Sequence, residues 1–177
     1  MATRSITLPA AAFYPTADVA SFTAARIQVK QSSAAVPSPR YLEWIFSTVA
    51  AEYIVTEFVA PANYVGAPVV NVYYKMTTAI ANEITWGCAM AAVSDNDATD
   101  MDADGFVSTG ATASPTVPGT AGYMDVAAIT MSTGTHDDSL VAGDHVVLTI
   151  FRDPAVPTSD ADSDAEFLGI DFTYSDV

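Results

Sequence analysis

The sequence predicts an all-β protein, an antiparallel β-sandwich preceded by an extended N-terminal arm. Segments rich in aromatic and β-branched residues recur along residues 41–177, with Gly- or Pro-containing turns between them. Alanine-rich stretches that could form helices are short or interrupted by proline. Half of the 177 residues are apolar, which is enough to bury a core. We therefore expect an arm over 1–40 and one sandwich domain over 41–177.

Seven segments are expected to form strands, in the order 41–46, 52–59, 69–76, 84–93, 123–131, 144–152 and 167–174. The first follows the breaker Pro37-Ser38-Pro39, and the fourth is rich in small residues that let another backbone approach. Cys88 lies in the fourth segment and should be a small buried hydrophobe, since it has no cysteine to pair with. The expected core comprises Trp44, Phe46, Val70, Val72, Leu148, Ile150, Ile170 and Phe172.

Charge divides the chain into two unequal parts. Residues 1–40 contain four of the six basic residues and one acid, a net charge of +3, whereas residues 41–177 have a net charge of −18. A basic, Ala/Ser/Pro-rich leader on an acidic body suggests that one part attaches and the other faces water. With a net charge of −15 and no cluster of Lys and Arg, the chain is not expected to bind nucleic acid. No secretion signal or 18-residue apolar run is present, so we expect synthesis in a cytoplasm and no membrane insertion.

Two acidic loops are candidate cation sites. Asp100, Asp102 and Asp104, followed by Gly105, match the opening half of a calcium loop, but Ala111 stands where the bidentate Glu should be. The alternative is a solvated loop, and we favour it over a Ca²⁺ site. The second loop, 160–166, has the same alternation without the Gly, and the two loops could share a cation. No other cofactor is expected.

Catalytic arrangements receive little support from the sequence. His136 lies in a predicted turn, His145 begins a predicted strand, and no G-x-S-x-G motif is present. A Cys-His pair involving Cys88 stays open without positive support, and three N/S ligands far apart are too few for a zinc site. Carboxylate pairs could arise by chance among 21 acids. The chain is therefore not expected to be an enzyme.

A set of segments resembles a known group of proteins. Trp44 is followed by Phe58–Tyr64, Val70–Tyr74 and Ile84–Trp86, and far downstream by Val141–Asp153 and Phe167–Tyr174. In this order they are similar to the single jelly-roll virion proteins of tailed bacteriophages, found as head decoration (cement) proteins and as fibre or appendage domains. The resemblance covers roughly residues 41–174 and implies a jelly-roll sandwich. Within it, Arg152 is expected either to pair with Asp153 or an acid of 160–166, or to be an exposed edge charge.

The resemblance also implies a function. The chain would decorate the outer surface of a phage capsid as a homotrimer and clamp subunits of the major capsid protein. Residues expected to bind the capsid are those of the arm, namely Arg4, Phe13, Tyr14, Phe22, Arg26, Lys30 and Arg40. Deleting 1–30 would then abolish capsid binding and leave a folded trimer. The alternatives are a fibre, tail or receptor-binding jelly roll and, in a different class, a carbohydrate-binding or carbohydrate-active β-sandwich.

Overall fold

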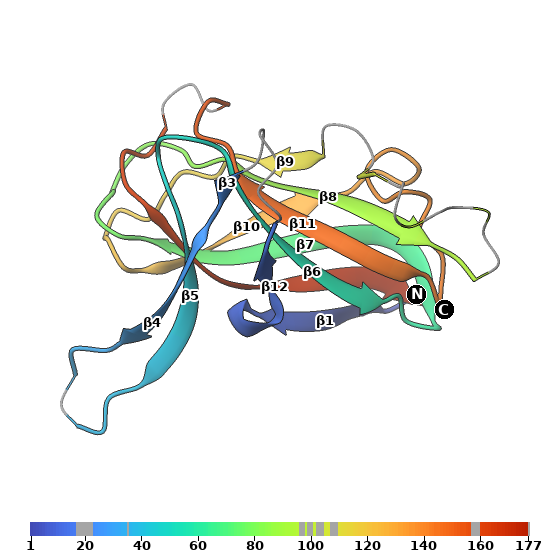
Figure 1. The fold of residues 1–177 in the computed structure, drawn as a ribbon, viewed down its shortest axis with the longest axis horizontal. Helices are drawn as coiled ribbons and strands as arrows, with labels where there is room; N and C mark the ends of the chain where they lie inside the picture. The colour runs from blue at the N-terminus through green and yellow to red at the C-terminus, as the bar shows by residue number, and fades with distance from the viewer. Residues whose placement is uncertain are drawn as a thin grey trace.

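The computed structural model describes residues 1–16, 23–34, 36–95, 98, 101, 105–106, 110–156 and 160–176. They form two sheets that pack face to face and are antiparallel except where the two-residue strand at Thr23–Ala24 pairs in parallel with Glu52–Tyr53 (Figure 1). In chain order the elements are β1 (Thr3–Pro9), the 3-10 turn η1 (Ala10–Ala12), β2 (Tyr14–Pro15), β3 (Thr23–Ala24), β4 (Arg26–Gln31), β5 (Arg40–Phe46), β6 (Glu52–Val59), β7 (Tyr64–Met76), β8 (Trp86–Val93), β9 (Ala111–Ala113), β10 (Met124–Thr130), β11 (His145–Arg152) and β12 (Ala165–Asp176). All seven predicted strands are present among them.

The eight strands from β5 to β12 have the connectivity of a jelly roll. One sheet carries them in the order β10-β7-β12-β5, and the facing sheet in the order β6-β11-β8-β9. Successive strands from β5 to β8 therefore alternate between the sheets, and the chain then returns through β9 to β12 to fill the remaining positions, as in an eight-stranded jelly roll. This topology confirms the predicted fold class of an antiparallel β-sandwich of jelly-roll type.

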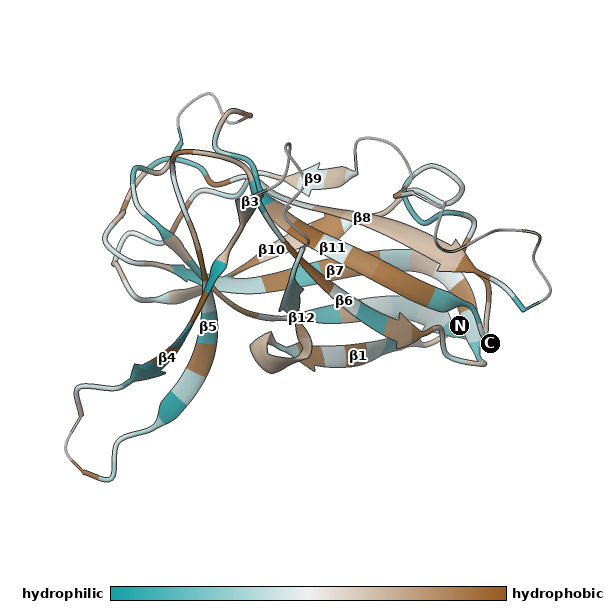
Figure 2. Ribbon diagram, in the orientation of Figure 1, coloured by the Kyte–Doolittle hydropathy of each residue, from teal (hydrophilic) through white to brown (hydrophobic). Residues whose placement is uncertain are grey.

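The core lies between the two sheets and contains every residue that the sequence assigns to it. Phe167 is fully buried at its centre, with its ring 4.9 Å from the ring of Phe13, 6.2 Å from Phe46 and 6.1 Å from Trp86. Cys88 is also buried, as expected, and burial raises the pKa of its thiol to about 12. Figure 2 shows hydrophobic stretches along the strands β8 and β11 that cover this core.

The first sixteen residues belong to the sandwich and do not form the extended arm that we expected over 1–40. β1 pairs with β12 from Thr3↔Ser175 to Pro9↔Gly169, and β2 pairs with β6 of the other sheet. The physical reason is visible in the sequence of β1, where Ile6 and Leu8 alternate with polar residues and pack against the core. Deleting residues 1–30 would therefore remove strands from both sheets and would not leave an intact sandwich.

The edge of β12 changes partner along its length, and this change releases β5 from the sheet. β5 pairs with β12 at only three positions, from Ala165↔Phe46 to Phe167↔Trp44. Beyond the irregularity between Phe167 and Gly169, β1 takes over the same edge. Gly169 has a φ of +142°, and a Cβ there would lie 2.7 Å from the backbone oxygen of Leu8. A glycine is therefore required where β1 replaces β5.

β4 and β5 continue past the sandwich as a hairpin. Six residue pairs join them, from Arg26↔Ile45 to Gln31↔Arg40, and the amide of Ser32 donates to the carbonyl of Pro39 across the loop. Figure 1 shows the hairpin projecting away from both sheets at the lower left. Residues 26–31 thus form a strand on the edge of the same sheet as β5.

Candidate functional site

The projecting hairpin carries an exposed apolar stripe, which we define as Ile27, Val29 and Leu42. The register places Val29 opposite Leu42, and Ile27 opposite the buried Trp44, so all three lie on the face of the hairpin that continues the core face of the sheet. Ile27 is 52% exposed and Val29 is 69% exposed, while Leu42 is partly buried against the core. Apolar side chains on the core side of the sheet are therefore exposed to solvent in the hairpin.

Basic residues lie on both faces of the hairpin: Arg40 shares the face of the stripe, whereas Arg26 and Lys30 lie on the opposite face. The hairpin over 26–46 contains Arg26, Lys30 and Arg40 and a single acid, Glu43, whereas the rest of the chain contains three cations and 20 acids. The side chain of Arg26 is 73% exposed and reaches Asp164 at 3.5 Å, and Lys30 is 43% exposed. The hairpin is therefore a positive projection on a strongly acidic body.

A buried ionic cluster fixes the base of the hairpin on the opposite face. Lys75 of β7 forms ion pairs with Glu43 of β5 and Glu166 of β12, and Lys30 of β4 lies 3.1 Å from Glu166. Glu43 is fully buried, and burial lowers the pKa of Lys75. The cluster joins four strands, so it sets the direction in which the hairpin leaves the sheet.

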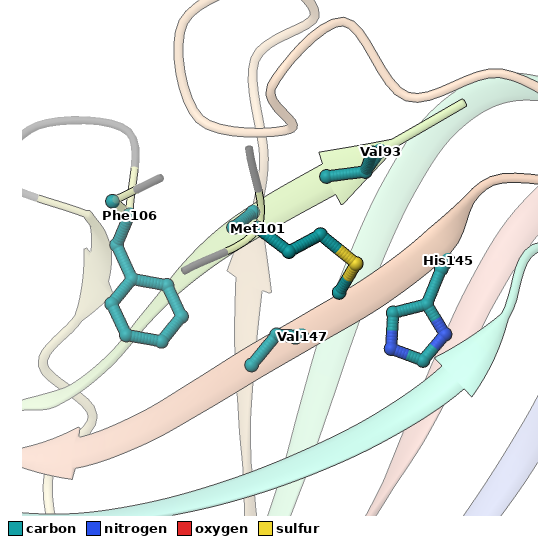
Figure 3. A pocket seen from close by; sticks show the side chains of 7 residues that line it. Val93, Met101, Phe106, His145 and Val147 are labelled. Carbon is teal, nitrogen blue, oxygen red and sulfur yellow. The ribbon is translucent and has the colours of Figure 1, made fainter. Parts of the chain in front are cut away.

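A shallow apolar hollow of about 160 Å³ lies at the far end of the other sheet, on its outer face (Figure 3). Val93 of β8 and Val147 of β11 form its floor together with Ala91, and Met101 and Phe106 lie over the strands. His145 closes one side, with its Nε2 3.2 Å from a carboxylate oxygen of Glu57. An exposed aromatic ring and a polar pair thus border one apolar surface.

The residues that the sequence analysis expects to bind the capsid lie in different environments. Arg4 donates from its Nε to Asp176 at 2.7 Å, Phe13 is buried in the core, and Tyr14 lies in β2 with 43% of its surface exposed. Arg26, Lys30 and Arg40 lie together on the hairpin, and Phe22 lies outside the described residues. The structure therefore groups only the last three cations of the predicted set on one projecting element.

Asp100, Asp102 and Asp104 lie outside the described residues, so the solvated loop that we favour there over a Ca²⁺ site stays a prediction. Among the described residues, no group of three or more His, Cys, Asp or Glu side chains could hold a metal ion.

In the second loop, Asp160 and Asp164 pair with arginines, and Glu166 pairs with lysines. Arg152 is fully buried and donates to Asp160 at 3.0 Å and to backbone carbonyls at Phe46, Ala161 and Ser163. This confirms its predicted pairing with an acid of 160–166.

The structure does not bring Cys88 and the histidines together. Cys88 of β8 is buried in the core between the sheets. His145 lies on the outer face of the same sheet, at the opposite end of the paired strands β8 and β11, where it pairs with Val93. His136 accepts a hydrogen bond from the amide of Ser132 in a turn. None of the helical segments described is long and apolar enough to cross a membrane.

Sequence reasoning missed the hairpin stripe and the hollow. The signal for the stripe is the alternation of Ile27 and Val29 with polar residues, which is typical of a strand with one apolar face. The hollow has no comparable signal, because its lining comes from β8, β11 and a connecting segment.

No family model matches this chain, and no curated protein matches it. Among solved structures, it is similar to the CBM36-1 domain of a multidomain xylanase from the hindgut metagenome of Trinervitermes trinervoides, with a TM-score of 0.48 and 6% identity over 98% of this chain and 100% of that one. It is also similar to a family 11 carbohydrate-binding module from Clostridium thermocellum, with a TM-score of 0.44 and 12% identity over 95% and 94%. A third is the CBM22-1 xylan-binding domain from Paenibacillus barcinonensis Xyn10C, with a TM-score of 0.41 and 12% identity over 85% and 83%. At these values the similarities carry no argument about a ligand.

Proposed function

We propose that this chain is a structural protein of a tailed-phage virion, a jelly roll that decorates the outer capsid surface and joins its assembly through the β4–β5 hairpin. One observation carries the proposal: a sheet runs past its own sandwich and exposes the apolar stripe to solvent, with Arg40 on the same face. The resemblance to single jelly-roll virion proteins supplies the biological setting.

The energetics suit docking to a protein surface. Covering Ile27 and Val29 would stabilise a complex by on the order of 1–2 kcal/mol each, since both are already partly buried. Arg40, on the same face as the stripe, favours a partner with exposed carboxylates, and this attraction speeds the encounter. The acidic remainder of the chain would face water and limit clumping of particles.

The test uses particles of the phage that encodes the chain. Mass spectrometry of purified virions should find it in hundreds of copies for a decoration protein, and in tens for the fibre alternative. The double variant Ile27→Asp/Val29→Asp places charges on the stripe and leaves the ionic cluster intact. It should stay folded and lose binding to particles that lack the chain, whereas Val49→Asp, at an 87% exposed residue elsewhere, should bind normally. Absence from virions, or full binding by the double variant, would contradict the proposal.

A second candidate function is carbohydrate binding at the hollow. The observation that favours it is the 40% exposed ring of Phe106 beside the His145–Glu57 pair, because sugars bind to aromatic faces with polar groups at the edge. A glycan array would test it, with Phe106→Ala as the variant that should lose any signal. If the wild-type protein gives no signal on the array, this candidate is excluded for the glycans tested.

A further inference from the structure

A groove of about 510 Å³ lies between the hairpin and the loop that contains Gly122. Two cross-strand pairs line it, Lys30 with Tyr41 on the hairpin and Lys75 with Glu166 in the sheet. Its volume falls within the range of roughly 300–1,000 Å³ that is typical of small-molecule sites. We infer that this groove binds a neutral saccharide, an activity that goes beyond the proposed function and does not depend on it.

The groove and the apolar stripe lie on opposite faces of the hairpin. The pair Lys30↔Tyr41 is next to the pair Val29↔Leu42 in the register of β4 and β5. Because neighbouring residues of a strand point to opposite faces, Lys30 and Tyr41 lie on the face away from the stripe. A hairpin that docks through its stripe would therefore keep the groove open to solvent.

The charges around the groove cancel. Lys75 forms ion pairs with Glu43 and Glu166, and Lys30 lies 3.1 Å from Glu166. Two ammonium groups thus face two carboxylates. A phosphate or sulfate would have to displace the carboxylates from the lysines, and a cation would have to displace the lysines from the carboxylates. This balance favours a neutral ligand.

The lining also offers unpaired hydroxyl groups beside an aromatic ring. The side-chain hydroxyls of Ser33, Tyr41 and Thr77 form no hydrogen bond with another described residue. Tyr41 is 38% exposed, and the Nζ of Lys75 lies 5.7 Å from the centroid of its ring. Saccharide hydroxyls both donate and accept hydrogen bonds, and the C–H groups of the sugar ring pack against aromatic rings. The lining therefore matches both parts of a saccharide.

The charged groups of the groove are held in place before a ligand binds. Glu43 is fully buried, and the side chains of Lys75 and Glu166 are 9% and 4% exposed. Ion pairs between neighbouring strands fix all three. A saccharide would not have to order these side chains, which lowers the entropic cost of binding.

A glycan array probed with the full-length chain tests the inference. Bacterial surface polysaccharides and free oligosaccharides would be printed as separate sets, so that the source of the ligand is read directly. Neutral glycans should bind, and excess inorganic phosphate should not displace the chain from them. No binding to any glycan on the array, or displacement by phosphate, would overturn the inference.

Variants of the groove locate the contact. Tyr41→Ala should weaken binding of the strongest array glycan by at least about tenfold. Thr77→Val removes one exposed hydroxyl at nearly constant shape and should weaken it by roughly threefold. Tyr14→Ala, at a 43% exposed tyrosine on the other sheet, is the matched control and should bind as the wild type does.

Phe106→Ala separates the groove from the hollow. If Phe106→Ala loses the glycan while Tyr41→Ala binds as tightly as the wild type, the glycan occupies the hollow and the inference fails. Wild-type binding by both Tyr41→Ala and Thr77→Val would also overturn it. Particle binding is measured separately with Ile27→Asp/Val29→Asp, so the inference and the proposed function can fail independently.

Discussion

The sandwich and its hairpin are built from the same alternating pattern, yet only the sandwich covers its apolar face. In β12, Phe167, Ile170 and Phe172 point inward and are fully buried beneath the facing sheet. In the hairpin, Ile27 and Val29 have equivalent positions on the core side and stay more than half exposed. The difference arises because β1 displaces β5 from the edge of β12. An alternating strand that extends beyond its facing sheet thus leaves its apolar side chains exposed to solvent.

The largest difference in unfolding free energy should come from truncating one side chain in the sandwich and one in the hairpin. Phe167→Ala removes a fully buried ring that contacts three other aromatic rings and should lower the free energy of unfolding by roughly 3–5 kcal/mol. Val29→Ala in the hairpin should change it by less than about 0.5 kcal/mol. Guanidinium unfolding of both variants provides the measurement. Equal losses would mean that the stripe is part of the core.

The ionic cluster at the base of the hairpin should show the next largest effect. Lys75→Met leaves Glu43 and Glu166 buried with only Lys30 nearby, and should cost about 3 kcal/mol of unfolding free energy. Adding Glu43→Gln and Glu166→Gln removes the uncompensated charges and should restore most of the loss. Chemical denaturation of the single and triple variants would measure this. If the triple variant were no more stable than the single one, charge burial would not be the cause.

The change of partner along β12 can be tested at Gly169. Gly169→Ala places a Cβ against the backbone of Leu8 at a φ that side chains rarely adopt, and should cost about 1–3 kcal/mol. Because the clash is with β1, hydrogen exchange should accelerate in Thr3–Pro9 more than in the hairpin. Gly119→Ala is the control, since a Cβ there meets nothing within 4 Å. Uniform acceleration across the chain would count against a local role for Gly169.

The smallest effect should be the acid sensitivity of the first residues. Hydrogen bonds from Arg4 and from the amide of Ala2 lower the pKa of Asp176. Since the folded-state pKa is lowered, the stabilisation is present above the ordinary value of about 3.9 and is lost as the pH falls through the lowered pKa. Amide exchange at the start of β1 should therefore accelerate in strong acid in the wild type. In Asp176→Asn it should already be faster near neutral pH and change less on acidification.

Much of the sandwich could be predicted from local pattern. The strands from β5 to β8 and from β10 to β12 either alternate apolar with polar residues or contain runs of aromatic and β-branched residues between clear turns. These signals are local, because each depends only on residues that are close in sequence. β1 was missed although Ile6 and Leu8 alternate, because its Pro- and Ala-rich surroundings favoured an arm. Its pairing with β12 joins residues at the two ends of the chain, and no local signal specifies it.

The candidate surfaces were less predictable than the fold. Sequence reasoning selected Arg26, Lys30 and Arg40 as attaching residues from the resemblance and from the basic charge of residues 1–40, and the structure places them on the projecting hairpin. It also selected Arg4 and Phe13, but Arg4 forms an ion pair with Asp176 and Phe13 is buried in the core. The charge and apolarity of a residue can be read from the sequence, whereas its exposure depends on which strand pairs at each edge of a sheet. Which strand pairs at an edge depends on the whole fold.

Hydrogen exchange of the chain, free and in purified particles, tests most directly whether the hairpin is the docking element. The account predicts that particle assembly slows exchange in residues 26–31 and 40–43, and leaves the strands that enclose Phe167 unchanged. Those strands are already protected by the core in the free chain. Unchanged exchange in the hairpin, with new protection confined to other surfaces, would contradict the account.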